Sequence, residues 1–225
     1  MAQSWHDLLF MHWPLPAATV RGLVPKQLDL DLWDNKAWVA VVPFWMSGVR
    51  ARGSPAIPGL SQFPELNVRT YVRYGGKPGV YFFSLDAGSL PAVWAARALY
   101  HLPYFHARMS ARSEGEDVAY SSERVGSEAQ FRGNYRPNSA IELRRKGTIE
   151  SWLTERYCLY TEYRGRAYIG EIHHAPWPLQ NASAEIECNT VAVAAGIELP
   201  DSSPLLHFAR RIDVLIWPIR RVGRV

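Results

Sequence analysis

The sequence predicts a mostly β fold of the α+β class, in which a curled antiparallel sheet or barrel carries a few short helices on its outside. Two observations support this prediction. Strand-like runs rich in β-branched and aromatic residues recur at hairpin spacing along the chain, and segments with helical periodicity are few and short. In addition, 48% of the 225 residues are hydrophobic and 12% are aromatic, which is enough for a substantial core. We therefore expect one domain over residues 1–225.

The strongest strand signal spans residues 66–74. One parity of this segment is mainly apolar. The other parity, which starts one residue earlier at Glu65, carries the polar residues Asn67 and Arg69. A period of two of this kind predicts a strand with one wet face.

A turn at residues 75–79 leads into a return strand, residues 80–85, which is apolar on nearly both faces and should lie inside the sheet. Ser89 can then cap a helix. The helix should end near Pro103, because proline lacks an amide donor and restricts the residue before it. The helix face expected to approach the sheet consists of small residues and one leucine: Ala92, Ala95, Ala96 and Leu99.

The N-terminal third contains weaker signals. Residues 5–11 form a short amphipathic segment that His12 to Pro16 should break, and residues 17–23 can form a helix. Asp34-Asn35-Lys36 is a turn sequence, so residues 28–33 and 37–45 should form a hairpin. Residues 48–62, rich in Gly and Pro, are expected as a long loop that is either disordered or a lid that gates a site.

The C-terminal half repeats the hairpin pattern. Two hairpins are expected, with strands at 107–113 and 118–125 and at 157–163 and 166–172. Between and after them we expect a strand at 130–135, a helical turn at 148–153, a short helix at 190–195 closed by Gly196, and a last strand at 212–216.

Composition constrains the partners. The net charge is +4, but the 25 basic residues are scattered among 21 acidic ones, so we expect no nucleic-acid partner. No apolar run approaches the ~20 residues of a membrane span, so we expect no membrane contact. Cys158 and Cys188 lack metal-like spacing and are expected as free, buried thiols, which favours the reducing cytoplasm. No glycine-rich phosphate loop follows a strand, and we expect neither a cofactor nor a metal.

Several motifs, in order along nearly the whole chain, resemble the YqjF-like proteins. They are LLFMHWPLP, VRGLVPKQLDL, WVAVVPFWMSGVR, FPELNVRTYV, GVYFFSLDA, LPYFHARM and PWPL. These proteins look like distant members of the acetoacetate decarboxylase-like superfamily. The resemblance implies a cone-shaped β-barrel with a small, largely apolar central cavity, and a tendency to form homo-oligomers.

The resemblance fails at the catalytic amine. In the decarboxylases the corresponding helix leads into a Phe-Pro-Lys-Lys sequence, one lysine of which forms a Schiff base with the ketone, whereas this chain has Leu102-Pro103-Tyr104-Phe105. The four lysines present stand beside Pro, Gly or charged turns, and a nucleophilic amine needs a desolvated or cation-crowded site. We therefore predict that the chain is not a Schiff-base decarboxylase.

By resemblance, Glu65 stands where the decarboxylases carry a pocket glutamate. If its parity faces the cavity, Arg69 would keep Glu65 ionised and orient an anionic or carbonyl oxygen, with Asn67 beside them, and Glu65 could act as a base. The alternative is that this parity is the outer, solvent-exposed face of the sheet, because alternation alone does not tell which side is the lumen.

Histidines and one tyrosine are further candidates. His101 is a candidate catalytic proton carrier with Glu65 and Arg69, and Tyr104 and His106 follow it at the helix exit. His12, beside a tryptophan, can line a cavity mouth, and His174 is a candidate binding residue. Each imidazole can instead be a packed or helix-terminal histidine without a role.

Three functions remain open at this stage. The first is an enzyme that acts on a small carbonyl or hydroxy compound by acid-base catalysis. The second is a non-catalytic protein that binds or senses a small apolar ligand in the same cavity. The third is an interaction protein whose barrel is filled with side chains.

Overall fold

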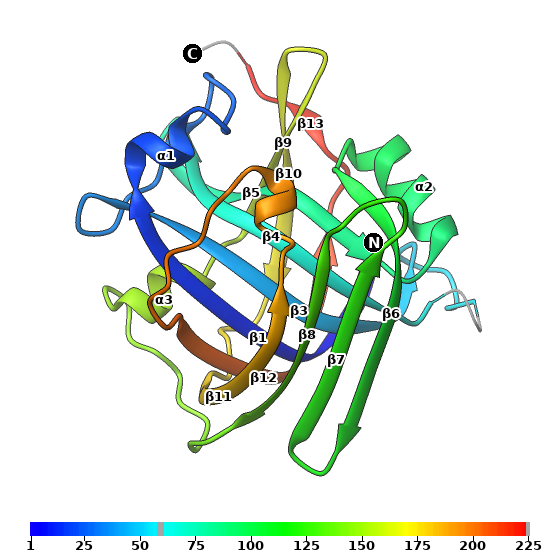
Figure 1. Ribbon diagram of the computed structural model, residues 1–225. Helices are drawn as coiled ribbons and strands as arrows, with labels where there is room; N and C mark the ends of the chain where they lie inside the picture. Colours follow the sequence, from blue (N-terminus) through cyan, green and yellow to red (C-terminus); the bar gives the residue numbers. More distant parts are fainter. Residues whose placement is uncertain (58–60, 224–225) are drawn as a thin grey trace.

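A computed structural model describes residues 1–57 and 61–223 of the chain. Among these residues the fold is mostly β, as predicted, with thirteen strands in one hydrogen-bonded sheet and a few short helices (Figure 1). The strands are β1 (Ala2–Pro16), β2 (Asp29–Leu30), β3 (Lys36–Arg50), β4 (Phe63–Tyr74), β5 (Lys77–Ala87), β6 (Tyr104–Glu114), β7 (Asp117–Arg124), β8 (Gln130–Pro137), β9 (Cys158–Tyr163), β10 (Arg166–His174), β11 (Gln180–Asn189), β12 (Leu205–Ile216) and β13 (Arg220–Arg221).

The sheet closes on itself twice. Nine strands form a closed barrel in the order β5-β6-β7-β8-β11-β12-β1-β3-β4, and β4 pairs back with β5. The β9–β10 hairpin closes a second ring of seven strands, because β9 pairs with the first part of β5 and β10 with the last part of β12. Strands β12, β1, β3, β4 and β5 therefore form a wall that the nine-strand barrel and the seven-strand ring share.

Each face of this shared wall carries its own core. Leu9 and Met11 of β1 belong to the core of the nine-strand barrel, whereas Leu8 and Phe10 belong to the second core. The same alternation separates Val68 of β4 from Tyr71. Since both faces of the wall are buried, the central parts of β1, β3 and β5 are apolar on both parities, whereas β4 keeps polar side chains on the face turned towards the second core.

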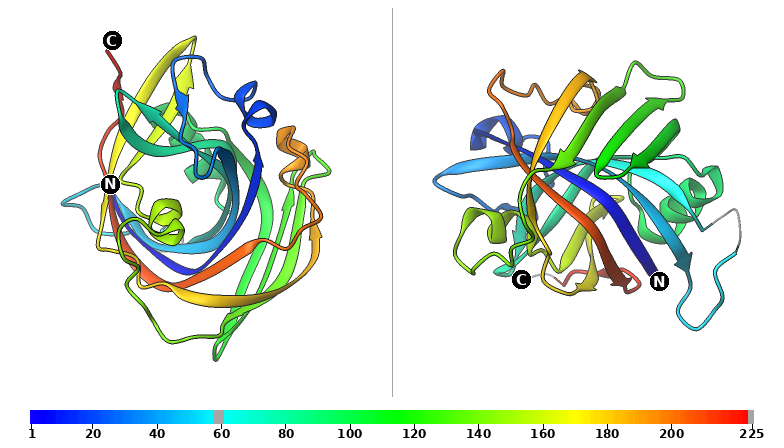
Figure 2. Two further views of the ribbon diagram at one scale, coloured as in Figure 1. Left: turned by 90° about the vertical axis from the view of Figure 1, so that its left-hand side faces the viewer. Right: turned by 90° about the horizontal axis from the view of Figure 1, so that it is seen from below.

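Three α-helices and one 3-10 turn complete the described residues: α1 (Ala17–Arg21), α2 (Leu90–Tyr100), α3 (Ile149–Thr154) and η1 (Val193–Ala195). Helix α2 is the crossover that lets β5 and β6 pair in parallel. Helix α3 lies within the curve of the shared wall, as Figure 2 (left) shows. The side chain of Trp152 on α3 packs against the rings of Tyr71 and Trp33.

The prediction for α2 is right in position and partly wrong in orientation. The Ser89 side chain caps the helix by accepting a hydrogen bond from Ala92 N, as expected. Val93 is the buried residue of the helix, whereas Ala95 is exposed and Leu99 is 66% exposed. Short helices with weak amphipathicity leave their buried face ambiguous, because alanine is tolerated on either side.

The N-terminal predictions need correction. Residues 5–16 form part of one strand, β1, rather than a segment broken at His12, because Pro14 and Pro16 lie in its last residues, where the chain leaves the sheet. Asp34 and Asn35 do adopt positive φ in a tight turn. However, β2 pairs with β4 and not with β3, so the expected hairpin is reduced to a single bridge.

The remaining elements agree with the prediction except at β11. The hairpins β6–β7 and β9–β10, the strands β4, β5 and β8, and the helix α3 all occur where the sequence indicated them, whereas β12 begins at Leu205, well before the strand expected at 212–216. The expected helix at 190–195 is shortened to η1 and is closed by Gly196 with φ 78°. Strand β11 was not predicted, because its segment lacks the large apolar side chains that mark a strand.

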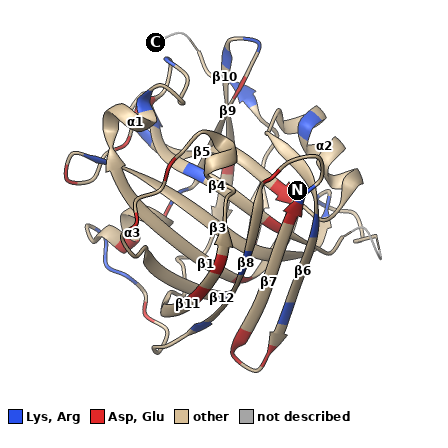
Figure 3. Cartoon of the chain, in the orientation of Figure 1, with Lys and Arg blue, Asp and Glu red and all other residues tan. Residues whose placement is uncertain are grey.

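The surface is mixed in charge. Figure 3 shows basic and acidic residues interspersed over several elements, without a basic face in this view. Both cysteines are free thiols, Cys158 buried and Cys188 only half-buried. Within the described ranges, no helix combines the length and the apolarity that crossing a membrane requires.

The loop expected at 48–62 begins later than predicted, because strand β3 continues to Arg50. The predicted lid includes residues 58–60, which lie outside the described residues.

Candidate functional site

The polar parity of β4 faces the inside of the seven-strand ring. Glu65, Asn67 and Arg69 lie on the same face as Tyr71, which belongs to the core of that ring, and they are 4%, 3% and 8% exposed. The solvent-exposed alternative for this parity is therefore wrong. The β9–β10 hairpin covers a face that would be wet in a simple antiparallel sheet.

Glu65 and Tyr104 form the central contact of the site. The Tyr104 hydroxyl donates a hydrogen bond of 2.6 Å to Oε2 of Glu65. Burial raises the pKa of the Glu65 carboxyl from its ordinary value near 4.5 to about 7, although hydrogen bonds from Tyr104 and Asn67 oppose the shift. Burial and the neighbouring Glu65 also raise the pKa of Tyr104 well above 10. Near neutral pH the carboxyl thus changes its protonation state while the phenol keeps its proton.

A small cavity of about 60 Å³ adjoins this pair. Residues from both ends of the chain and from α2 line it: Met1, Gln3, Trp5, Glu65, Phe82, Leu85, Ala96, Tyr100, Leu102, Tyr104, Leu159, Ile172 and Ile216. Most of these side chains are apolar, and the polar groups among them are the Glu65 carboxyl, the Gln3 amide and the hydroxyls of Tyr100 and Tyr104. The volume suits a compound of a few carbon atoms rather than a drug-sized ligand, which needs at least about 300 Å³.

A β-bulge in β1 aims Trp5 at the cavity. Asp7 has φ 51°, and the pairing of β1 with β3 shifts register in this region, so Trp5 and Leu8 face the same interior despite their odd spacing. The Asp7 carboxylate is held by Arg210 at 2.6 Å and by the hydroxyl of Ser113 at 2.6 Å. The sequence carried no clear signal for this bulge, because a bulge needs only one residue out of phase.

Arg69 does not pair with Glu65, contrary to the sequence prediction. Its guanidinium lies 5.4 Å from the centre of the Phe10 ring and 6.0 Å from that of Tyr71, deeper in the ring than the cavity. Among the described residues, no carboxylate lies within salt-bridge distance of Arg69. The raised pKa of Glu65 agrees with this, since a nearby guanidinium would have kept the carboxyl ionised.

His12 is fully buried in the ring rather than at a cavity mouth. Its Nε2 lies 2.8 Å from the Tyr71 hydroxyl, and its ring centre lies 6.4 Å from that of His207. Burial, and then the positive charge of Arg69, lower the pKa of His12 well below 6.5, and burial lowers that of His207 to about 4. Both imidazoles are therefore neutral near pH 7.

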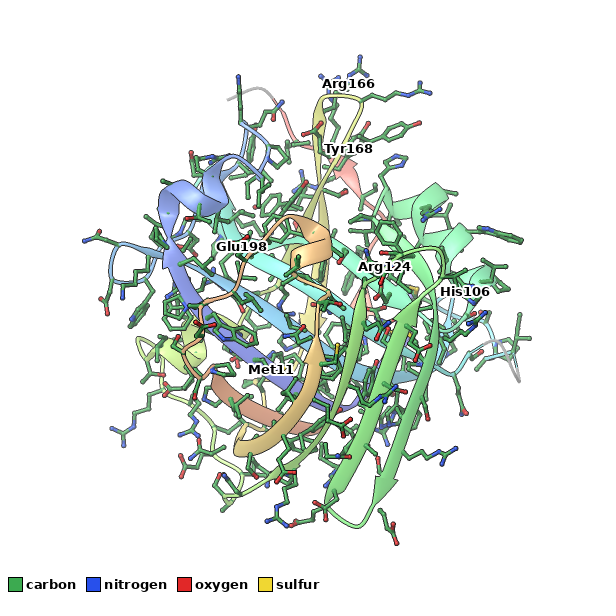
Figure 4. All side chains as sticks on the ribbon, viewed as in Figure 1. Met11, His106, Arg124, Arg166, Tyr168 and Glu198 are labelled. Carbon is green, nitrogen blue, oxygen red and sulfur yellow. The ribbon has the colours of Figure 1, made fainter. Side chains whose placement is uncertain are left out.

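The structure separates the other histidines from Glu65. His101 ends α2 with φ 53° and stacks on Tyr163 at 4.1 Å, so the phenol of Tyr104, and not this imidazole, meets the carboxyl. His106 lies on β6 beside β7, where its carbonyl accepts from Val125 N (Figure 4). His174 is buried against Tyr157 and the Trp177 region, with Nδ1 2.7 Å from the carbonyl of Ala175.

Sequence reasoning missed two groups that act on Glu65: Tyr120 holds its backbone carbonyl, and the charge of Asp86 adds to the rise of its pKa. The Tyr120 hydroxyl donates to the Glu65 carbonyl at 2.7 Å and to that of Phe44 at 3.0 Å, from the nine-strand barrel behind the wall. Asp86, beside Glu65 on β5, forms a buried ion pair with Arg124 at 2.7 Å. Only the closure of the barrel brings Tyr120 and Arg124 against β4 and β5, so no local pattern identifies them.

Two further observations delimit the chemistry. All four lysines are exposed, and Lys77 is paired with Glu171. Within residues 1–57 and 61–223, no group of three or more His, Cys, Asp or Glu side chains is placed to hold a metal. A larger hollow of about 810 Å³ lies at the turn of β9–β10, near the labelled Arg166 in Figure 4. We regard the smaller cavity at Glu65 as the candidate site, because a buried carboxyl lines it.

Comparison with known proteins gives a family and a fold. The model of a family described as DUF2071, uncharacterized conserved protein, matches residues 2–213. The "Uncharacterized protein YqjF" of Bacillus subtilis (strain 168) is 52% identical over 222 residues, which is 98% of this chain and 92% of that protein.

Solved structures of acetoacetate decarboxylase-like enzymes share the fold. The enduracididine biosynthesis enzyme MppR complexed with pyruvate aligns with a TM-score of 0.68 at 8% identity, over 99% of this chain and 90% of that one. An acetoacetate decarboxylase-like enzyme from Sphingomonas wittichii RW1 aligns with a TM-score of 0.67 at 14% identity, over 100% and 94%. Acetoacetate decarboxylase from Legionella pneumophila gives 0.61 at 12% identity, over 99% and 87%. At such identities the likeness concerns the fold alone.

Proposed function

This chain belongs to the DUF2071 family, and from that premise we propose that it performs general acid-base chemistry on a small carbonyl or hydroxy compound in the cavity beside Glu65. The observation that carries the proposal is the carboxyl itself. Its pKa of about 7 lets it exist as a base and as an acid at neutral pH, and a base is most effective when its pKa lies near the working pH.

The roles follow from the contact between the two groups. Glu65, as a carboxylate, removes a proton from the carbon next to the carbonyl and returns it in the reverse step. The Tyr104 hydroxyl, which keeps its own proton, donates to Glu65 in the free protein and turns to the carbonyl oxygen of the substrate when Glu65 has taken up the proton. The lining is mostly apolar, and electrostatic effects are stronger in apolar surroundings than in water. MppR, which shares the fold, is complexed with pyruvate in one of its structures, and this supports small oxo compounds as the first ligands to test.

Schiff-base decarboxylation remains excluded from the proposal. Tyr104 and Phe105 stand where the resemblance places the lysines, and the lysines present are exposed. We predict that sodium borohydride traps no adduct between the protein and pyruvate or acetone. An adduct of the expected mass, found by mass spectrometry of the intact protein, would contradict this part of the proposal.

Proton exchange tests the reaction class without knowledge of the natural substrate. The protein is incubated in D2O with pyruvate, acetone or hydroxyacetone, and proton NMR follows the loss of the signals next to the carbonyl. We expect exchange with at least one of them, and a loss of about 100-fold or more in Glu65→Gln while binding is kept. Exchange that is unchanged in Glu65→Gln would refute the role of the carboxyl.

The alternative is a non-catalytic binding protein that uses the same cavity. It is favoured if these compounds raise the melting temperature without exchange. The volume of about 60 Å³ restricts either function to small ligands. Oligomerisation, a cytoplasmic location and the lack of a nucleic-acid partner remain predictions.

A further inference from the structure

Arg69 presents an uncompensated charge inside the seven-strand ring. The residue is 8% exposed, and among the described residues no carboxylate pairs with it. Other buried arginines in the chain are paired: Arg124 with Asp86 at 2.7 Å, and Arg156 with Asp31 at 2.5 Å. A buried ion without a partner is costly, so this exception calls for a counter-ion from outside the chain.

The groups around Arg69 supply no negative charge. The rings of Phe10 and Tyr71 flank the guanidinium, and His12 is a neutral imidazole. Aromatic faces attract a cation but do not neutralise it. The Nε of Arg69 and the Oδ1 of Asn67 have no hydrogen-bond partner among the described residues. Unsatisfied polar atoms at this density inside a core indicate a place where a polar molecule binds.

We propose that the ring binds a small monocarboxylate, whose carboxylate lies against the Arg69 guanidinium and whose reactive end lies at Glu65. This rests on the proposed function and names its substrate class. One guanidinium balances one negative charge, which favours a monoanion over a dianion. The planar fork of arginine matches a carboxylate, with which it forms two parallel hydrogen bonds.

The geometry of β4 limits the length of the ligand. Glu65 and Arg69 are four residues apart on one strand face, about 13 Å between their Cα atoms. Asn67 lies between them and hydrogen-bonds Glu65. Neither Asn67 nor Arg69 lines the cavity, so in the proposed complex the flexible Arg69 side chain turns towards Asn67, and a ligand of about three to five carbon atoms beside Glu65 then meets it.

Binding measurements on Glu65→Gln test the proposal separately from catalysis. Calorimetry compares pyruvate with pyruvamide, a neutral molecule of nearly the same shape. We expect pyruvate to bind at least about tenfold more tightly, and the preference to vanish in Arg69→Gln. Arg112→Gln, at an exposed position of β6, is the matched control and should keep it. Equal affinity of the two compounds, or a preference kept in Arg69→Gln, would overturn the proposal.

A second measurement remains useful if Arg69→Gln folds poorly. Removal of an unpaired buried charge should not destabilise the free protein, so Arg69→Met should melt at the same temperature as the parent chain or higher, and should no longer gain stability from pyruvate. If Arg69 has only a structural role, Arg69→Met should melt at a lower temperature than the parent chain. Pyruvate should then stabilise the parent chain no more than pyruvamide does. These two results together would overturn the proposal. If proton exchange fails while the anion preference stands, only the catalytic proposal is lost.

Discussion

The buried carboxyl of Glu65 should make the stability of this protein depend on pH in a defined direction. A carboxyl whose pKa is higher in the folded chain than in the unfolded chain binds its proton more tightly when folded. Between pH 4.5 and pH 7 the folded chain therefore holds a proton that the unfolded chain has released. Stability is fully present below pH 4.5, falls as the pH rises through this window, and stays at its lower level above pH 7.

The magnitude follows from the shift. A rise from about 4.5 to about 7 corresponds to about 3 kcal/mol of lost stability above pH 7, at about 1.4 kcal/mol for each pH unit. Glu65→Gln removes the ionisation and keeps an oxygen that accepts from Tyr104. The variant should therefore gain about 3 kcal/mol relative to the parent chain on going from pH 4.5 to pH 8.

Urea unfolding at pH 4.5, 6, 7 and 8 measures this difference, provided that both proteins unfold in two states. Glu116→Gln, in the exposed turn between β6 and β7, is the control and should show no pH-dependent difference. A difference between Glu65→Gln and the parent that is the same at every pH would refute the reasoning, because it would mean that Glu65 ionises as easily in the folded chain as in water.

Three further predictions concern neighbouring features. Tyr104→Phe removes a hydrogen bond that lowers the pKa of Glu65, so the carboxyl titration followed by 13C NMR should move above pH 7, and an unchanged or lower midpoint would contradict this. Asp86→Asn leaves Arg124 buried without its carboxylate and should cost about 3–5 kcal/mol in urea unfolding, whereas a loss below about 1 kcal/mol would mean that the pair is not desolvated. The side chain of Trp94 on α2 is 62% exposed, and we expect copies of the chain to associate through it, so light scattering should show a smaller mass for Trp94→Glu than for the parent; a monomeric parent contradicts the prediction.

Local patterns were sufficient for most strands and insufficient for their partners. Hairpins such as β6–β7 and β9–β10 are encoded by short turns between β-rich runs, so their positions were predictable. The pairing of β5 with both β6 and β9, and of β12 with both β10 and β11, depends on how the whole sheet curls. The periodicity of a single strand does not indicate that its hydrogen-bonded neighbour changes from one strand to another along its length.

The candidate site shows the same limit. Alternation identified the set Glu65, Asn67 and Arg69, and the structure places all three inside the ring. The pattern did not predict how they would pair, since residues four apart on a strand can turn towards or away from each other. The expected Glu65–Arg69 pair was wrong for this reason, and His101 was selected for its titration range although its ring stacks on Tyr163.

A phenol rather than an amine at position 104 limits the chemistry that the proposed site can support. A lysine in such a pocket attacks a carbonyl because its pKa falls on burial, leaving a neutral nucleophile. Burial has the opposite effect on Tyr104, since it raises the pKa of the phenol and keeps it protonated beside Glu65. The hydroxyl can then donate a hydrogen bond to a carbonyl oxygen but does not form an imine. In the proposed reaction the proton therefore moves through Glu65, whose pKa of about 7 allows it to accept and release one in each cycle.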